Sequence, residues 1–225
     1  MSSVDHRSLA ERYAQLAVGV SPRSRDRALR ALDIVIAATA LVVLAPLAAL
    51  IALGVVVTSG RPVFYRGRRV GRYGRIFTMR KFRTLRHEAE SRLGGAYGAE
   101  LTARMPEEAT PLGRFLRASH LDELPQLWNV LRGDMSVVGP RPVRPVFFEQ
   151  LVVDIPAYWQ RLVVRPGLTG FAQTRMGREE AWAEKLAHDL EWIADRSVRL
   201  YLRIVAATVV RVLRQSLRSL FGQRA

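Results

Sequence analysis

The sequence predicts an α+β protein that is mostly helical, with a re-entrant membrane helix broken at Pro46, a small β-hairpin, and a compact helical domain carrying interfacial amphipathic helices. Three observations lead to this prediction. An uncharged apolar run from Ile34 to Val57 has a proline near its middle. Two strand-like segments with glycines between them follow this run. Much of the remaining chain places apolar residues at helical spacing.

The composition indicates one compact domain with an anchor, and an anionic partner. The chain has 225 residues, of which 49% are hydrophobic, and a formal net charge of +15. A charge of this size favours phosphates, acidic lipid head groups or nucleic acid as partners. Because the chain contains no cysteine, disulfides, thiol nucleophiles and cysteine-ligated zinc are excluded.

The apolar run Ile34–Val57 exceeds the roughly 20 residues that a transmembrane helix needs. Pro46 removes a helix hydrogen bond and should kink or break the helix. Both flanks are rich in arginine, and basic flanks mark the cytoplasmic side of a membrane. A helix–break–helix that enters and leaves one leaflet satisfies both flanks, so we expect a lead-in at 1–22, a re-entrant membrane helix at 23–59 and a domain at 60–225. An ordinary spanning helix is the alternative.

The segments Pro62–Arg66 and Arg75–Arg80 have strand-like composition, and the glycines between them predict a hairpin. The surrounding stretch 61–83 is strongly basic and contains no acidic residue. These charges predict a solvated edge that also contacts anionic lipid. A helix over Thr84–Leu93 and a polar loop over Gly94–Thr110 should follow.

The next stretch predicts a short helix from near Asp122 to near Arg132. Pro125 suits a first helical turn, and Gly133 suits the position just past a helix end. The apolar residues recur at the spacing of one buried face. They are Leu124, Leu127, Trp128 and Leu131.

This helix would carry two adjacent carboxylates, Asp122 and Glu123, at its N-terminus. Free backbone N–H groups and the helix dipole favour negative charge there and keep a carboxylate ionised. An ionised carboxylate beside a second one suits a nucleophile and a metal ligand. Spacing alone favours a simpler interpretation, in which Asp122 caps the helix and Glu123 is a solvated acid.

The segment Pro140–Pro142 holds Arg141 between two prolines, which restrict their neighbours and position this arginine for an anion. Rigidity of the segment alone is the alternative. A helix is predicted for Pro145–Ile155, with its apolar residues inward. These are Phe147, Phe148 and Leu151.

The chain from Glu179 to its end should be largely helical. Its arginines between Arg196 and Arg218 project within about 120° of one another on a helical wheel. Two interpretations remain open for this segment. It is either a basic amphipathic helix lying in a membrane interface, or a helix that packs its apolar side on the core and solvates its arginines.

Together these segments resemble the bacterial sugar transferase family, the monotopic phosphoglycosyl transferases. The resemblance covers about 27–213, which is nearly the whole chain, and the family has a re-entrant anchor. It rests on the following segments: Gly60–Tyr65, Arg80–Thr84, Leu121–Gln126, Gly133–Ser136, Gly139–Pro142 and Arg165–Gln173.

The resemblance implies an enzyme that moves a sugar-1-phosphate from a UDP-sugar to polyprenyl (undecaprenyl) phosphate, releases UMP, and initiates exopolysaccharide, O-antigen or related glycan synthesis. It implies that Asp122 forms a covalent phosphosugar ester and that Glu123 binds Mg²⁺. It also implies four residues that contact phosphate or nucleotide. These are Lys81, Arg83, Arg141 and Arg165.

The implied location is the inner (cytoplasmic) membrane of a bacterium, where a monotopic protein with its catalytic domain, 60–225, on the cytoplasmic face would also contact anionic lipids. A homodimer is physically reasonable for such an enzyme, and nucleic acid is not expected as a partner. The alternative is a non-catalytic, membrane-anchored basic binding or scaffold protein. The positive net charge of the chain would suit binding to nucleic acid. The chain lacks a zinc pattern, an aromatic-rich RNA motif and a helix-turn-helix.

Overall fold

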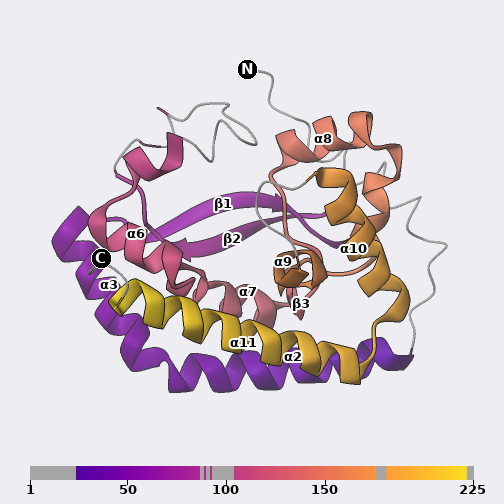
Figure 1. The fold of residues 1–225 in the computed structure, drawn as a ribbon, viewed down its shortest axis with the longest axis horizontal. Coiled ribbons are helices and arrows are strands. Elements are labelled where there is room, and N and C mark those ends of the chain that lie inside the picture. The colour runs from indigo at the N-terminus through magenta and orange to yellow at the C-terminus, as the bar shows by residue number, and fades with distance from the viewer. Residues whose placement is uncertain (1–23, 87–88, 90–91, 93–103, 176–180, 222–225) are drawn as a thin grey trace.

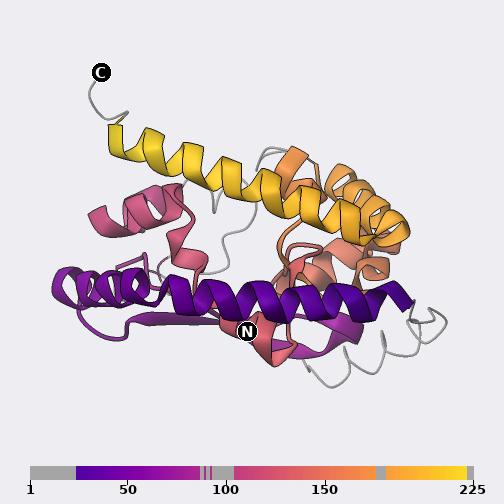
Figure 2. The same ribbon diagram turned by 90° about the horizontal axis from the view of Figure 1, so that it is seen from below.

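The computed structural model describes residues 24–86, 89, 92, 104–175 and 181–221, and within these ranges the chain is mostly helical with a small antiparallel hairpin. Helices α2 (Ser24–Val43) and α11 (Val198–Phe221) run along one face of the molecule (Figures 1 and 2). Helix α7 (Gln126–Arg132) packs on both α2 and the hairpin, which lies on the other side of α7 (Figure 1). The mostly helical α+β class is confirmed.

Helix α2 is followed by α3 (Ala45–Ser59), and the two are bent by 62° relative to each other. Pro46 lies in the first turn of α3, where its missing N–H breaks the hydrogen-bond ladder between the two helices. The break predicted at Pro46 is therefore confirmed. No single helix of the described ranges is long and apolar enough to cross a bilayer, whereas this bent pair together has the length and composition to do so.

The predicted hairpin is confirmed, with strands longer than the sequence indicated. Strands β1 (Phe64–Val70) and β2 (Ile76–Phe82) are antiparallel, and Tyr65 lies opposite Lys81. A short 3₁₀ turn, η1 (Arg72–Gly74), connects them.

Helix α7 starts at Gln126, which is later than the predicted start near Asp122. Residues Leu121–Glu123 form a separate 3₁₀ turn, η2. Pro125 has no N–H with which to continue a helical ladder from η2 into α7. Both carboxylates of the pair therefore lie in η2, ahead of the α-helix. The predicted end is confirmed, since Gly133 has φ +88° and terminates α7.

The predicted buried face of α7 is wrong at Trp128, whose side chain is 47% exposed. Leu127 and Val130 are buried as core residues, together with the polar Gln126 and Asn129. The helix therefore buries two amide side chains where a purely apolar stripe was expected, and it turns its tryptophan outward.

Asp33 joins the elements around the main core. Its buried carboxylate accepts hydrogen bonds from the Ser136 hydroxyl and the Val137 N–H of β3 (Ser136–Val138), each at 2.8 Å. It also accepts one from the Tyr201 hydroxyl of α11 at 2.9 Å. Strand β3 pairs in parallel with β4 (Gly167–Thr169). One side chain of α2 thus holds α11 and the short parallel pair against the same core.

Five further elements complete the described chain. They are α6 (Pro111–Ala118), α8 (Pro145–Asp154), η3 (Pro156–Val163), α9 (Phe171–Arg175) and α10 (Trp182–Asp195). Helix α8 buries Phe148 and Leu151 as predicted, while Phe147 is half-buried under the Arg144 guanidinium.

Other sequence predictions fall partly or wholly outside the described ranges. The lead-in 1–22 lies outside them, as does half of the helix predicted at 84–93. Of the rest of that helix, Ala89 and Arg92 are helical, whereas the prediction is wrong over 84–86, because Leu85 forms an isolated β-bridge with Ala109. Of the loop predicted at 94–110, residues 104–108 are helical, which corrects that prediction over these residues. The helical prediction from Glu179 onward is confirmed by α10 and α11.

Helix α11 packs on the core through Tyr201 and Ile204, which are both buried. Its outer face carries exposed apolar side chains beside exposed arginines. These are Val198, Leu202, Val209 and Leu213, and Arg199, Arg203 and Arg214.

The predicted arginine stripe of this helix is wrong at two positions. Arg196 is buried and binds Asp26 of α2 at 2.8 Å. Arg211 donates to the backbone carbonyls of Gln173 and Thr174. The helix therefore both packs on the core and presents an amphipathic outer face.

Candidate active site

Strand β2 and turn η2 bring one lysine against two carboxylates. The Lys81 Nζ atom lies 2.5 Å from Glu123 Oε1 and 3.7 Å from Asp122 Oδ2. All three side chains are largely buried. With Arg141, which also contacts Glu123, the structure therefore brings together four of the six residues that the sequence predicted for the site.

Asn129 fixes helix α7 against strand β2, which carries Lys81. Its buried side-chain amide donates to the Thr78 carbonyl at 2.8 Å and accepts from the Arg80 N–H at 3.1 Å, so α7 is fixed along β2. Because β2 side chains alternate between two faces, this docking sets which side of the strand Lys81 occupies. A sequence pattern of apolar spacing gave no indication of this role.

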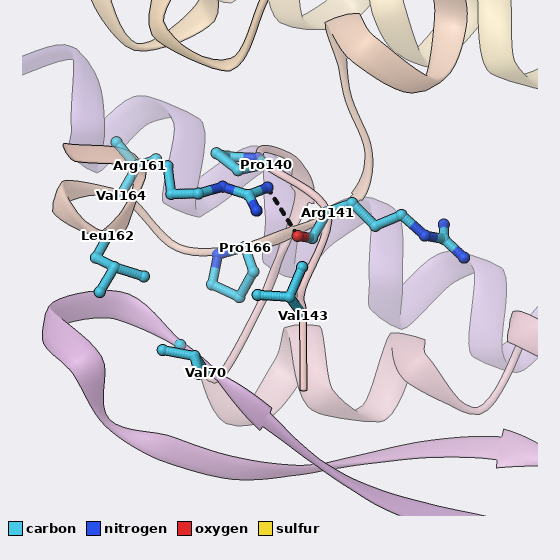
Figure 3. A pocket seen from close by; sticks show the side chains of 9 residues that line it. Val70, Pro140, Arg141, Val143, Arg161, Leu162, Val164 and Pro166 are labelled. Atoms are coloured by element: carbon cyan, nitrogen blue, oxygen red, sulfur yellow. Dashed lines mark hydrogen bonds between the residues drawn. The ribbon is translucent and has the colours of Figure 1, made fainter. Parts of the chain in front are cut away.

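Arg141 supplies a second cation. Its Nη2 atom lies 3.3 Å from Glu123 Oε1, and its side chain is 54% exposed. Figure 3 shows the Arg141 side chain extending away from its own backbone, whose carbonyl accepts a hydrogen bond from Arg161 at 2.8 Å. Arg161 is itself buried and bound to Asp189 at 2.8 Å. This buried pair holds the Arg141 backbone, while the half-exposed Arg141 guanidinium extends to Glu123.

The cavity shown in Figure 3, between Val70, Val143 and Leu162, is too small to be a ligand site. It measures about 10 Å³ and is lined mainly by aliphatic side chains. A volume of this size holds about one water molecule.

The two carboxyl groups differ in their electrostatics. Burial raises the pKa of the Asp122 carboxyl; Lys81 acts against this and the Glu123 charge adds to it, leaving the pKa above its ordinary value. For Glu123, burial is outweighed by Lys81 and Arg141, so its pKa lies well below the ordinary range. Glu123 is therefore firmly ionised, whereas Asp122 carries its charge at a cost.

Arg83 and Arg165 lie elsewhere in this conformation. The buried Arg83 guanidinium donates to the carbonyls of Ser59, Gly60 and Arg61, just beyond the end of α3. Arg165 donates to the Gly133 carbonyl at 2.9 Å, at the end of α7. Both guanidinium groups satisfy helix-end carbonyls in this conformation.

Two further residues act on the carboxylates. Arg117, at the end of α6, and His120 lower the pKa of Asp122 through their charge. The sequence gave no role to either, since α6 follows the stretch expected to be a loop. The signal that could have found Arg117 is the amphipathic spacing of 111–118 directly before the carboxylate pair.

The described residues contain no group of three or more potential ligands from His, Cys, Asp and Glu. A hard cation such as Mg²⁺ nevertheless fits the carboxylate pair, because Mg²⁺ is commonly held by one or two carboxylates with water and substrate phosphates completing its shell. The ionised Glu123 is the better ligand of the two. Lys81 and Arg141, which now neutralise it, would turn to substrate phosphate oxygens.

A carboxylate pair ringed by cations suits substrates that carry phosphate groups. The sequence model of the bacterial sugar transferase family matches residues 24–215. The chain therefore belongs to this family, which confirms the resemblance.

Several relatives are named as undecaprenyl-phosphate sugar phosphotransferases. The chain is 41% identical over 193 residues to a UDP-glucose:undecaprenyl-phosphate glucose-1-phosphate transferase of Xanthomonas campestris pv. campestris, covering 81% of this chain and 38% of that protein. A protein of the same name from Caulobacter vibrioides is 41% identical over 185 residues, covering 80% and 67%.

A UDP-N-acetylgalactosamine-undecaprenyl-phosphate N-acetylgalactosaminephosphotransferase of Aeromonas hydrophila is 35% identical over 187 residues, covering 82% of this chain and 43% of that protein. The chain thus spans less than half the length of two of these three relatives.

The raised pKa of Asp122 predicts that Asp122→Asn stabilises the metal-free protein at pH 7. An ionised buried carboxylate lowers stability above its folded pKa, and this penalty disappears below its ordinary value of 3.8, where both states are protonated. In thermal unfolding with a chelator, the variant should have the higher Tm, by about 2–4 °C for each kcal/mol relieved. The difference should shrink as the pH falls towards 4.

Asp154→Asn, at an exposed aspartate, is the matched control and should leave Tm nearly unchanged. A lower Tm for Asp122→Asn at pH 7 would show that the Asp122 charge stabilises the fold.

Proposed function

We propose that this protein is a phosphoglycosyl transferase that moves a sugar-1-phosphate from a UDP-sugar to polyprenyl phosphate. The observation that carries the proposal is the buried Asp122–Glu123 pair, held between Lys81 and Arg141. The names of the relatives support it, since they describe transfer of a sugar phosphate to undecaprenyl phosphate. The product would begin an exopolysaccharide or a related glycan, as the name of an exopolysaccharide production protein among the relatives suggests.

In the first step, a carboxylate oxygen of Asp122 attacks the sugar-linked phosphorus of the UDP-sugar. A new O–P bond forms, the bond from this phosphorus to the UMP oxygen breaks, and its electron pair leaves with UMP. The enzyme then carries the phosphosugar as an ester on Asp122. The raised pKa supports this role, because an ionised but poorly stabilised carboxylate is a better nucleophile.

In the second step, a phosphate oxygen of the polyprenyl phosphate attacks the same phosphorus. The bond to Asp122 breaks, its electron pair returns to the carboxylate, and the lipid diphosphate sugar leaves. Neither step needs a proton from the protein, which agrees with a site built from fixed charges.

Lys81 and Arg141 would bind phosphate oxygens and compensate the charge that develops on the leaving UMP. Both already lie within 3.3 Å of a carboxylate oxygen of Glu123. Glu123 would hold Mg²⁺, which would add further neutralisation of the diphosphate. For Arg83 and Arg165 the family resemblance remains the basis of a phosphate or nucleotide role.

We further propose that α2 and α3 form a re-entrant membrane anchor within 23–59, with the catalytic domain, 60–225, on the cytoplasmic face of the bacterial inner membrane. The 62° bend and the exposed apolar side chains around it support this arrangement. The amphipathic outer face of α11, on the same face as α2, would rest on anionic lipid (Figure 2). A homodimer is compatible with this arrangement.

A non-catalytic basic binding or scaffold protein is the less favoured alternative. Such a protein gains nothing from two buried carboxylates, and burial of the Asp122 charge costs stability. The relatives described above are all named as transferases or phosphotransferases.

The reaction predicts Mg²⁺-dependent release of UMP from one member of a panel of UDP-sugars when polyprenyl phosphate is present. Asp122→Asn should lower this turnover by at least about 1,000-fold, because the nucleophile is lost. Released UMP is measured with the detergent-solubilised protein, and Asp154→Asn serves as the active control. Near-full turnover in a clean preparation of Asp122→Asn would exclude the mechanism.

The re-entrant arrangement predicts that both ends of the helix pair are accessible from the cytoplasmic side alone. The chain has no native cysteine, so single reporters can be placed by Ala28→Cys and Thr58→Cys, both at exposed positions. A membrane-impermeant maleimide should label both in inside-out vesicles and neither in intact spheroplasts. Val43→Cys, at the bend, should resist labelling from either side.

Labelling of the two end reporters from opposite sides would instead indicate an ordinary spanning helix. Labelling of Val43→Cys from one side to the same extent as the end reporters would show that the bend is not in the bilayer.

A further inference from the structure

Two cations share one oxygen of the Glu123 carboxylate. The Lys81 Nζ atom lies 2.5 Å from Glu123 Oε1, and the Arg141 Nη2 atom lies 3.3 Å from the same oxygen. Because the Lys81 ammonium also lies 3.7 Å from Asp122 Oδ2, the four side chains form one cluster. When both carboxyl groups are ionised, the positive and negative charges of this cluster cancel.

This balance of charge opposes the binding of a divalent cation to Glu123. A metal ion at this carboxylate would be repelled by two cations at close range, and such repulsion is strong where water is excluded. The Lys81 side chain is 17% exposed and that of Glu123 is 13% exposed, so water screens these charges little. Glu123 therefore becomes a good metal ligand only after its two cations have moved away.

Both cations are long side chains on a backbone that is held in place. Lys81 lies in β2, which is paired with β1, and its ammonium is carried by a flexible four-carbon chain. The Arg141 carbonyl accepts a hydrogen bond from Arg161, and the Pro140 carbonyl accepts one from the Gly167 N–H at 2.8 Å. The half-exposed Arg141 side chain extends away from these contacts (Figure 3). Each cation can therefore exchange Glu123 for another anion without a change in the fold.

The diphosphate of a UDP-sugar is such an anion. Its oxygens bind lysine as a point charge and arginine as a fork. Once Lys81 and Arg141 have turned to these oxygens, Glu123 is left without its counter-ions. A ligand that draws cations away from a metal site raises the metal affinity of that site, and by linkage the metal raises the affinity for the ligand by the same factor.

We propose that Lys81 and Arg141 act as internal counter-ions of Glu123, which keep Mg²⁺ from this carboxylate until the donor diphosphate binds. This inference rests on the proposed function and adds a form of regulation to the same site. The free protein has a low affinity for the metal, and Mg²⁺ and the UDP-sugar bind cooperatively. Removal of a cation that supports donor binding should therefore increase the metal affinity of the free protein.

The affinity of the free protein for Mn²⁺, followed by the loss of the EPR signal of the unbound ion, tests this consequence. The protein is titrated in neutral detergent at pH 7 without nucleotide. Lys81→Gln should bind Mn²⁺ at least about tenfold more tightly than the wild type, because the nearest repelling charge is gone. Arg141→Gln should show a smaller gain, because its guanidinium is farther away and more exposed.

Three control variants separate a local counter-ion from an effect of net charge. Lys81→Arg keeps the charge beside Glu123, and Arg75→Gln removes an exposed arginine directly before β2. Both should bind Mn²⁺ within about twofold of the wild type, since a distant exposed charge is screened by salt. Adding Glu123→Gln to Lys81→Gln should abolish the gain, because the ligand itself is lost.

A titration of the unaltered protein keeps the test independent of variant folding. The ligand is a UDP-sugar analogue with a methylene group between its two phosphorus atoms, which cannot release UMP. With this analogue bound, the wild type should bind Mn²⁺ at least about tenfold more tightly than alone. The gain should be smaller in Lys81→Gln, where part of the opposing charge is already absent. Protein-free titrations correct for the Mn²⁺ that the analogue binds by itself.

The outcomes separate the counter-ion role from the proposed function. If Lys81→Gln and Arg141→Gln bind Mn²⁺ no more tightly than the wild type, the counter-ion role is wrong. An analogue that leaves the Mn²⁺ affinity of the wild type unchanged would also overturn it. The titrations without nucleotide need no donor, so they decide the counter-ion role even for a protein that turns over no UDP-sugar. Absence of UMP release from every donor would instead overturn the proposed function.

Discussion

The buried amide of Asn129 fixes the relation between α7 and the hairpin, and the remainder of the site depends on that relation. It hydrogen-bonds the backbone of β2 at Thr78 and Arg80, so the strand cannot slide along the helix without losing both contacts. A shift by one residue would exchange the two faces of the strand. Lys81 would then point away from the carboxylates, and Arg80 would point towards them. One amide thus keeps the two cations on their separate sides.

The two carboxylates of η2 receive unequal charge compensation. Burying a carboxylate costs free energy unless a cation compensates it, and Lys81 is shared unequally, at 2.5 Å from Glu123 and 3.7 Å from Asp122. Glu123 receives most of the compensation and has the depressed pKa; Asp122 receives less and has the raised one. Two adjacent acidic residues thereby have their pKa values shifted in opposite directions by their surroundings.

The sequence predicted those features that depend on local chemistry. The hairpin followed from strand-like residues and glycines, the break from Pro46, and the end of α7 from Gly133. Features set by tertiary contacts were missed. Trp128 is exposed although its spacing predicted burial, and Arg196 is buried in an ion pair with Asp26. Arg83 caps the end of α3, although its motif suggested phosphate. Arginine looks the same in sequence whether it binds a carbonyl, a carboxylate or a substrate.

Asp122 is proposed to carry the phosphosugar between the two substrates, and trapping that ester is the most direct test of this role. The purified protein would be mixed with its UDP-sugar and Mg²⁺ without polyprenyl phosphate and quenched rapidly. Its mass would then be measured both intact and after digestion into peptides. We expect a burst of UMP, a mass increase of one sugar phosphate on the peptide containing Asp122, and no increase in Asp122→Asn. A mass increase on another residue would contradict it. So would UMP release that needs the acceptor from the first turnover, with no adduct at any time.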